Sequence, residues 1–121
     1  MSVATKTLRT LIAAGTSNGV GLTKTSTTWD LRTAFGGLLT IKITNGATGP
    51  TVPANVTVKT SGDGTNWKTH RTYVSLTGNN VVSEWSTPIP EGAMYVQVAV
   101  SGNTGQAVTC EAYGQEVTSV G

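Results

Sequence analysis

The residue types that carry out catalysis are few in this chain, and no spacing brings them together. The one histidine, His70, lies in the segment 67–73, where alternation places it on the same face as Lys68 and Thr72. General acid–base or triad chemistry would need a nucleophile or an orienting carboxylate beside this imidazole, and the sequence singles out neither. His70 is therefore interpreted as a structural or surface residue. A small hydrolase is the least favoured hypothesis, and we expect no enzyme and no catalytic residue.

The carboxylates and the possible metal ligands also predict no catalytic or metal site. The six carboxylates are Asp30, Asp63, Glu84, Glu91, Glu111 and Glu116. Glycoside cleavage would need two of them to face each other across a cleft, which the short predicted loops do not favour. One histidine and one cysteine fall short of any zinc ligand set, and Asp63 lacks the oxygen-rich series of a calcium loop. We therefore expect no metal site and no cofactor.

The charge content excludes further classes of partner. Only 12% of the residues are charged, and the 8 basic and 6 acidic side chains are scattered, giving a net charge of +2. Without a basic stripe there is little to bind nucleic acid. No apolar run approaches membrane-spanning length, so no membrane partner is expected. Because Lys6 and Arg9 interrupt the apolar start of the chain, no signal peptide is predicted, and synthesis in a cytoplasm is expected.

The elements that position these residues are strands. Apolar and polar residues alternate along most of the chain, most clearly over 37–44, and glycine or asparagine breaks the pattern about every ten residues. Eight strands are predicted, at 5–13, 21–31, 38–44, 55–60, 67–76, 81–85, 94–101 and 107–115. We predict one domain over residues 1–121, an all-β antiparallel β-sandwich of jelly-roll type. The predicted core contains Leu39, Ile41, Ile43, Val56, Val58, Val96, Val98, Val100, Val108 and Cys110, with Met94 also facing inward.

The two ends of the chain are the candidates for contact with a neighbour. Residues 1–14 are predicted to form an arm or an edge strand, in which Val3, Leu8, Leu11 and Ile12 would pack against another subunit. Residues 116–121 are predicted to be a flexible tail.

The three tryptophans, Trp29, Trp67 and Trp85, have three open interpretations. Each could cap an end of the core with its indole N–H bonded to a partner, which is the interpretation the sequence favours. Each could instead anchor a protein interface. The third interpretation is an exposed platform on which sugar rings stack, as in carbohydrate-binding modules.

Three segments carry a family resemblance. They are Trp29 to Pro50, the turn Ser61-Gly-Asp-Gly-Thr-Asn-Trp67, and Ala93 to Gly105. Together they resemble the small β-sandwich structural proteins of tailed bacteriophages and prophages, especially capsid decoration (cement) proteins. The resemblance lies in turn and strand patterns, so no functional residue is carried over from it.

The resemblance implies a virion protein that binds the outer surface of an assembled head and stabilises it. Its partners would be the major capsid protein and further copies of itself, in a homo-oligomer. The low charge, the abundant threonine and valine and the missing active site agree with this hypothesis. The alternative is a carbohydrate-binding or receptor-binding module of a tail fibre that uses exposed tryptophans.

Overall fold

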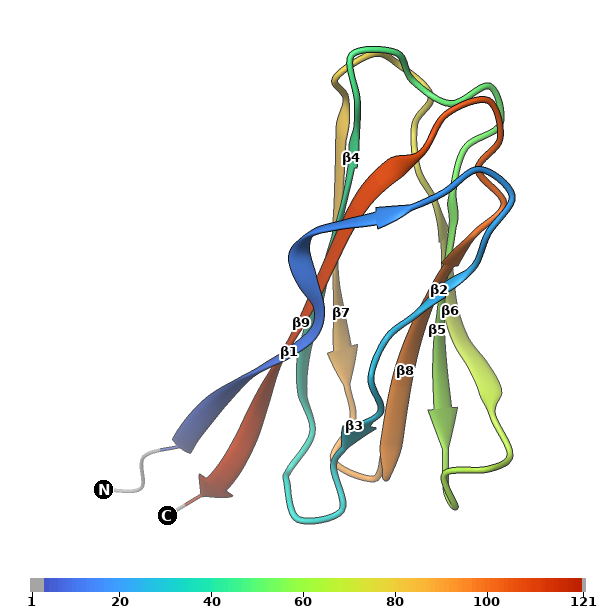
Figure 1. Cartoon of the computed structure of the whole chain (residues 1–121). Coiled ribbons are helices and arrows are strands. Elements are labelled where there is room, and N and C mark those ends of the chain that lie inside the picture. The colour runs from blue at the N-terminus through green and yellow to red at the C-terminus, as the bar shows by residue number, and fades with distance from the viewer. Residues whose placement is uncertain (1–3, 121) are drawn as a thin grey trace.

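The computed structural model describes residues 4–120, and this part of the chain contains nine strands and no helix (Figure 1). The strands are β1 (Ala4–Asn18), β2 (Lys24–Thr25), β3 (Trp29–Asp30), β4 (Gly37–Asn45), β5 (Asn55–Ser61), β6 (Lys68–Val74), β7 (Val82–Ile89), β8 (Tyr95–Ser101) and β9 (Val108–Val120).

The strands form two antiparallel sheets that pack face to face. Sheet A has the order β1-β9-β4-β7, and sheet B has the order β2-β8-β5-β6, with β3 pairing to β8 below β2. The first strand thus pairs with the last, β2 and β3 with β8, β4 with β7, and β5 with β6. This nested pairing across two sheets is the topology of a jelly roll, so the expected fold is confirmed.

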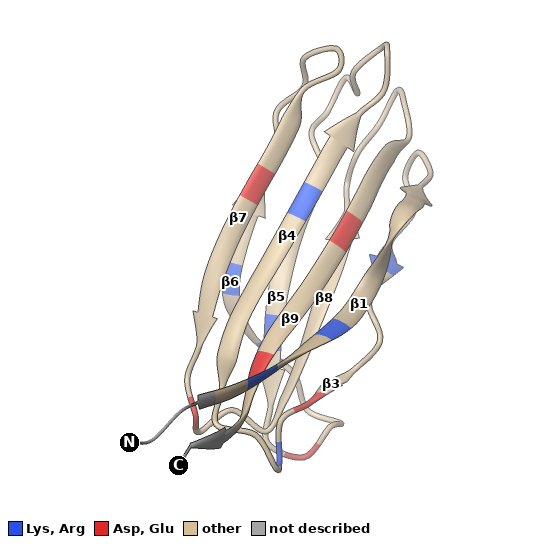
Figure 2. Ribbon diagram, turned by 90° about the vertical axis from the view of Figure 1, so that its left-hand side faces the viewer, with Lys and Arg blue, Asp and Glu red and all other residues tan. Residues whose placement is uncertain are grey.

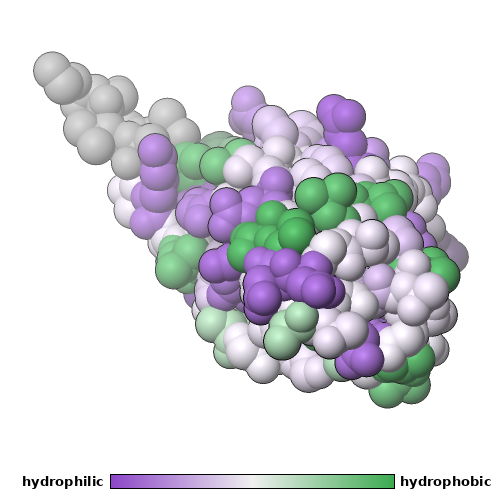
Figure 3. All heavy atoms as spheres, turned by 90° about the horizontal axis from the view of Figure 1, so that it is seen from above, coloured by the Kyte–Doolittle hydropathy of each residue, from purple (hydrophilic) through white to green (hydrophobic). Residues whose placement is uncertain are grey.

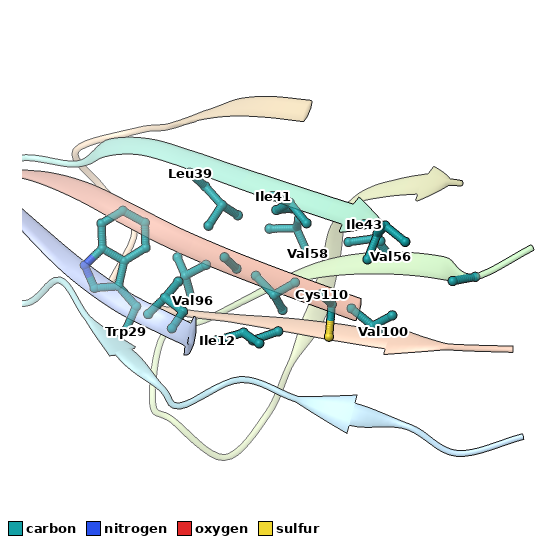
Figure 4. Packing of buried hydrophobic residues seen from close by; sticks show 14 of the residues in the cluster. Ile12, Trp29, Leu39, Ile41, Ile43, Val56, Val58, Val96, Val100 and Cys110 are labelled. Carbon is teal, nitrogen blue, oxygen red and sulfur yellow. The ribbon is translucent and has the colours of Figure 1, made fainter. Parts of the chain in front are cut away.

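The core lies between the sheets because alternate residues of each strand point inward. Figure 4 shows Leu39, Ile41 and Ile43 of β4 facing valines of β5 and β8 across this space. The ten residues predicted to form the core are all buried. Met94 was predicted to face inward with them, and that prediction is wrong, since this side chain precedes β8 and is exposed.

Two expected segments differ from the structure. The strand predicted over 21–31 is two short strands in the structure. The three residues 26–28 lie opposite only two residues of β8, 97–98, and this extra residue interrupts the pairing. Ser26 bridges the irregularity: its N–H donates to Val98 O, and its Oγ accepts from Val98 N. The tail predicted over 116–121 is wrong for the described residues, because Glu116 to Val120 belong to β9 and pair with β1.

The two sides of the sandwich are closed by different contacts. On one side, Tyr73 of β6 stacks on Trp85 of β7, with ring centroids 5.2 Å apart and planes inclined by 20°. The Tyr73 hydroxyl also hydrogen-bonds Thr87, which is buried in β7. On the other side, Thr27 N donates to Leu11 O and so joins the segment after β2 to β1. The loops at the two ends of the sandwich therefore extend from a closed, packed body.

Candidate functional site

Four loops meet at one end of the sandwich, shown at the top of Figure 1. They are the connections 19–23, 46–54, 75–81 and 102–107, and we call this surface the four-loop end. The strands β1 and β9 begin and end at the opposite end, together with the loops 31–36, 62–67 and 90–94. The beginning of β1 and the end of β9 therefore lie away from the four-loop end.

Buried asparagines hold these loops in place. Asn103 is 0% exposed; its Nδ2 donates to Asn18 O and Gln106 O, and its Oδ1 accepts from Asn18 Nδ2 at 2.6 Å. The Asn45 side chain, also buried, donates to the carbonyls of Leu76 and Gly78 at 2.8 Å each. Hydrogen bonds buried from water rigidify the groups they join, so the loops present a fixed surface.

The four-loop end carries no formal charge. None of its four loops contains Asp, Glu, Lys or Arg, whereas each loop at the opposite end contains one charged residue (Arg32, Asp63 or Glu91). Figure 2 shows this difference, because its upper loops are entirely tan while the red and blue marks lie on the strands and the lower loops. A partner could therefore cover this end without removing an ion from water.

Large apolar side chains are exposed at the same end. Leu22 is 62% exposed and Leu76 60% exposed, and Val20 and Val52 are each about half exposed in neighbouring loops. Figure 3 looks onto this end and shows green hydrophobic atoms among white and purple, more hydrophilic ones. Exposed apolar groups without charge are typical of the centre of a protein interface. This end is the candidate docking surface.

A second candidate site is a shallow depression on the outer face of sheet A, with a volume of about 320 Å³. We call it the sheet A groove. Its lining is formed by Thr40, Ile41, Lys42, Glu84, Trp85, Ser86, Glu111 and Tyr113. Lys42 of β4 is paired in register with Glu84 of β7 on one side and with Glu111 of β9 on the other (Figure 2).

The charged groups and the phenol in the sheet A groove are connected. Lys42 Nζ lies 3.6 Å from Glu111 Oε1, and the Tyr113 hydroxyl donates to Glu111 Oε2 at 2.9 Å. The pKa of the Tyr113 hydroxyl is raised, first because this hydrogen bond holds its proton and second because the phenol is partly desolvated. The Tyr113 side chain therefore stays neutral, and its hydrogen bond to Glu111 holds the ring in place on the sheet.

The N-terminal interaction surface that the sequence predicted is largely buried. Val3 lies outside the described residues, Leu8 is exposed, and Leu11 and Ile12 belong to the core. The prediction that Leu11 and Ile12 are available to a neighbour is wrong. A bulge between Thr10 and Ile12 makes Leu11 an extra residue in β1, which allows two consecutive side chains to face inward.

The three tryptophans do not form a platform. Trp29 is only 2% exposed and packs in the core, Trp85 is half-buried against Tyr73, and Trp67 is half-buried at the end of the 62–67 loop. They lie on β3, on β7 and in this loop, so the hypothesis of exposed tryptophans that stack sugars is wrong for Trp29 and unsupported by the placement of the other two. The burial of Trp29 and Trp85 fits the interpretation as core and core-edge residues. The expected partner for the indole N–H is wrong for Trp29, whose Nε1 is buried and makes no hydrogen bond within the described residues.

The remaining candidate groups stay apart. His70 lines a depression between the loops 62–67 and 90–94 that has no carboxylate in its lining. Cys110 is buried, and burial raises the pKa of its thiol. Among residues 4–120, no three His, Cys, Asp or Glu side chains gather where they could hold a metal ion. The same residues include no helix long and apolar enough to span a membrane.

Sequence reasoning missed the residues that make both candidate sites. Lys42, Glu84, Glu111 and Tyr113 come from three strands, and only the register of β7, β4 and β9 brings them together. Alternation did place Lys42 on the outer face, opposite Leu39 and Ile41. The missing charge of the four-loop end was visible in the loop sequences, but the topology was needed to gather those loops at one end.

Comparison with known proteins identifies the fold. No protein-family model and no curated protein matches the sequence. The SPBc2 prophage-derived protein YomS matches over 93% of this chain and 95% of its own, with 14% identity and a TM-score of 0.54. The K3 adhesin domain of Lys-gingipain from Porphyromonas gingivalis W83 matches over 82% of this chain and 71% of its own, with 13% identity and a TM-score of 0.57.

A carbohydrate-binding module, TmCBM61, solved with β-1,4-galactotriose, also matches. It covers 82% of this chain and 67% of its own, with 14% identity and a TM-score of 0.51. At these identities the likeness of all three structures concerns the β-sandwich fold alone.

Proposed function

We propose that this protein is a non-enzymatic structural protein of a bacteriophage particle, a decoration protein on the outer surface of the head. Its partners are the major capsid protein and neighbouring copies of the chain. The observation that carries the proposal is the uncharged four-loop end, where rigid loops expose leucine and valine side chains.

The physical case for docking through this end has three parts. These leucine and valine side chains are about half exposed, and each one that becomes fully buried against a partner stabilises the contact by about 1 kcal/mol. The loops are already ordered by Asn103 and Asn45, so binding loses little conformational entropy. An uncharged surface also avoids the cost of burying an unpaired ion. These properties suit a subunit that stays bound to an assembled shell.

The prophage-derived YomS supports the biological setting. It matches this chain over almost the full length of both, and its prophage origin agrees with the phage resemblance of the three sequence segments. The likeness itself is one of fold.

Quantitative mass spectrometry of gradient-purified particles tests the proposal. We expect a copy number of the same order as that of the major capsid protein. A copy number lower by tens would instead indicate the tail or a fibre. Absence of the chain from the particles would contradict any virion role.

The docking end is tested by rebinding to particles that lack the protein. The double substitution Leu22→Asp and Leu76→Asp places charge on the four-loop end and is expected to abolish binding without unfolding the chain. Leu8→Asp is the matched control, because Leu8 is equally exposed at 60% and lies on β1, outside this end. Loss of binding with the control alone would move the contact to β1.

Carbohydrate binding is the second candidate function. It is favoured by the sheet A groove together with the fold likeness to TmCBM61, which was solved with an oligosaccharide. The carbohydrate hypothesis from the sequence placed the sugar on exposed tryptophans. The structure instead offers the sheet A groove as the candidate sugar site.

A further inference from the structure

We propose that the sheet A groove binds a neutral saccharide, with Tyr113 as the contact for the sugar ring and Glu84, Lys42 and Ser86 as its hydrogen-bonding groups. This inference rests on the second candidate function and supplies its residues and ligand class. It does not depend on docking through the four-loop end, which none of these residues belongs to.

The groove has the size and the arrangement of a ligand site. Its volume of about 320 Å³ lies at the lower end of the range of about 300–1,000 Å³ usual for small-molecule sites. Two cross-strand rows make its floor. One row contains Ser86, Thr40 and Tyr113, and the next contains Glu84, Lys42 and Glu111. All six side chains stand on paired strands, so their spacing is fixed by the sheet.

Tyr113 supplies the apolar contact. Its hydroxyl is held by Glu111, so the ring has little freedom left to lose when a ligand packs against it. A pyranose ring has an apolar face of C–H groups and a rim of hydroxyls, which matches an aromatic ring bordered by polar side chains.

The polar groups of the groove have unused hydrogen-bonding capacity. Within the described part of the chain, the Glu84 carboxylate and the Ser86 hydroxyl make no hydrogen bond or ion pair. Lys42 makes one long contact with Glu111, which leaves ammonium protons for a ligand. Neighbouring sugar hydroxyls both donate and accept, so one can donate to Glu84 while the next accepts from Lys42.

The charge balance of the groove selects a neutral ligand. Lys42 is already paired with Glu111, and Glu84 therefore leaves the groove with an excess negative charge. A sialic acid, a uronic acid or a phosphate would place a second anion beside this carboxylate, and like charges a few ångströms apart repel. Neutral hexoses and N-acetylhexosamines carry no such penalty.

Titration of the isolated chain, followed by two-dimensional amide NMR spectra, tests the inference. The probes are cellotriose, β-1,4-galactotriose, maltotriose and N-acetylchitotriose, each to about 10 mM, and sialyllactose as the acidic probe. At least one neutral probe is expected to bind with a dissociation constant of ~1 mM or tighter. The shifted amides are expected to lie in 40–42, 84–86 and 111–113. Sialyllactose is expected to bind no more than a tenth as tightly.

Variants decide which contact is responsible. Tyr113→Ala is expected to weaken binding about tenfold, which corresponds to ~1.4 kcal/mol. Glu84→Gln is expected to reduce the discrimination against sialyllactose. Thr44→Ala is the control, because Thr44 lies on the same face of β4 outside the groove and should leave binding unchanged. Thermal melting confirms that each variant is folded.

Two outcomes would overturn the inference: no shift with any neutral probe, or shifts that map elsewhere. Because the titration uses no particles, its failure leaves the decoration proposal standing. Failure of the rebinding experiment, in turn, leaves the groove untouched.

Discussion

Gly114 of β9 lies directly against the indole of Trp29, and the ring occupies the space that a side chain at position 114 would fill. A Cβ atom built on Gly114 would lie 2.7 Å from each of three ring atoms of Trp29. In Figure 4 the indole of Trp29 lies beyond Leu39 and Val96, with its nitrogen pointing away from them. The glycine in a central strand thus allows the largest core side chain to reach across from sheet B.

Gly114→Ala should therefore destabilise the fold by overpacking. We expect a loss of about 1–3 kcal/mol in the free energy of unfolding, the usual cost of an extra group in a filled core. Urea denaturation measures it. Gly92→Ala is the matched control, because a Cβ there meets nothing within 4 Å, and it should change stability by less than about 0.5 kcal/mol. Equal effects of the two substitutions would contradict the packing of Trp29 on Gly114.

Trp85→Ala should lower stability because Trp85 and Tyr73 close one side of the sandwich. Fully buried tryptophans lose about 3–5 kcal/mol on truncation, and we expect about 2 kcal/mol for this half-buried ring. Trp85→Phe keeps an aromatic stack and should recover most of the loss. Denaturation of the three proteins compares them. Unchanged stability of Trp85→Ala would mean that the indole serves a surface contact instead.

Asn103→Ala should loosen the four-loop end. The substitution removes the amide that joins Asn18, Gly19 and Gln106, and leaves buried polar groups unpaired, at about 1–3 kcal/mol each. We expect a loss of at least about 2 kcal/mol and faster amide hydrogen exchange in 19–23 and 102–107. Asn79→Ala, which removes one exposed hydrogen bond to Gly49, is the control and should cost less than about 1 kcal/mol.

The stabilisation that Asp63 contributes to the 62–67 loop depends on pH. Backbone N–H groups of Asn66 and Thr65 donate to its carboxylate at 2.8 Å and hold its pKa well below the usual range. Because the folded pKa is lower than the unfolded value of about 3.9, the stabilisation is fully present above about pH 4. It is lost as the pH falls through the folded pKa.

The effect of Asp63 can be isolated by comparing Asp63→Asn with the unsubstituted protein. The stability difference between the two should be constant above about pH 4 and should shrink below it. Urea denaturation over this range measures the difference. Asp30, whose pKa is lowered to about 2 by hydrogen bonds from Arg32, is present in both proteins and cancels. A difference that grows on acidification would contradict the assignment.

Most of the fold was accessible from the sequence, while the sites were not. Alternation located every strand of the core, since burial on one face leaves a period-two pattern that needs no knowledge of partners. The bulge that turns both Leu11 and Ile12 inward breaks that period and was therefore misread. The contact of Trp29 with Gly114 and the row of Glu84, Lys42 and Glu111 depend on strand pairing, which a single sequence does not encode locally.

The position of β9 in sheet A determines when the molecule can finish folding. β9 lies between β1 and β4, yet it is the last of the nine described strands to leave the ribosome. Until then β1 has no paired strand and β4 pairs with β7 alone, so both expose open edges that invite pairing with other nascent chains. Closure through such distant contacts is slow, on the order of milliseconds to seconds. Slower synthesis at lower temperature reduces the concentration of these open chains and should raise the yield of folded protein.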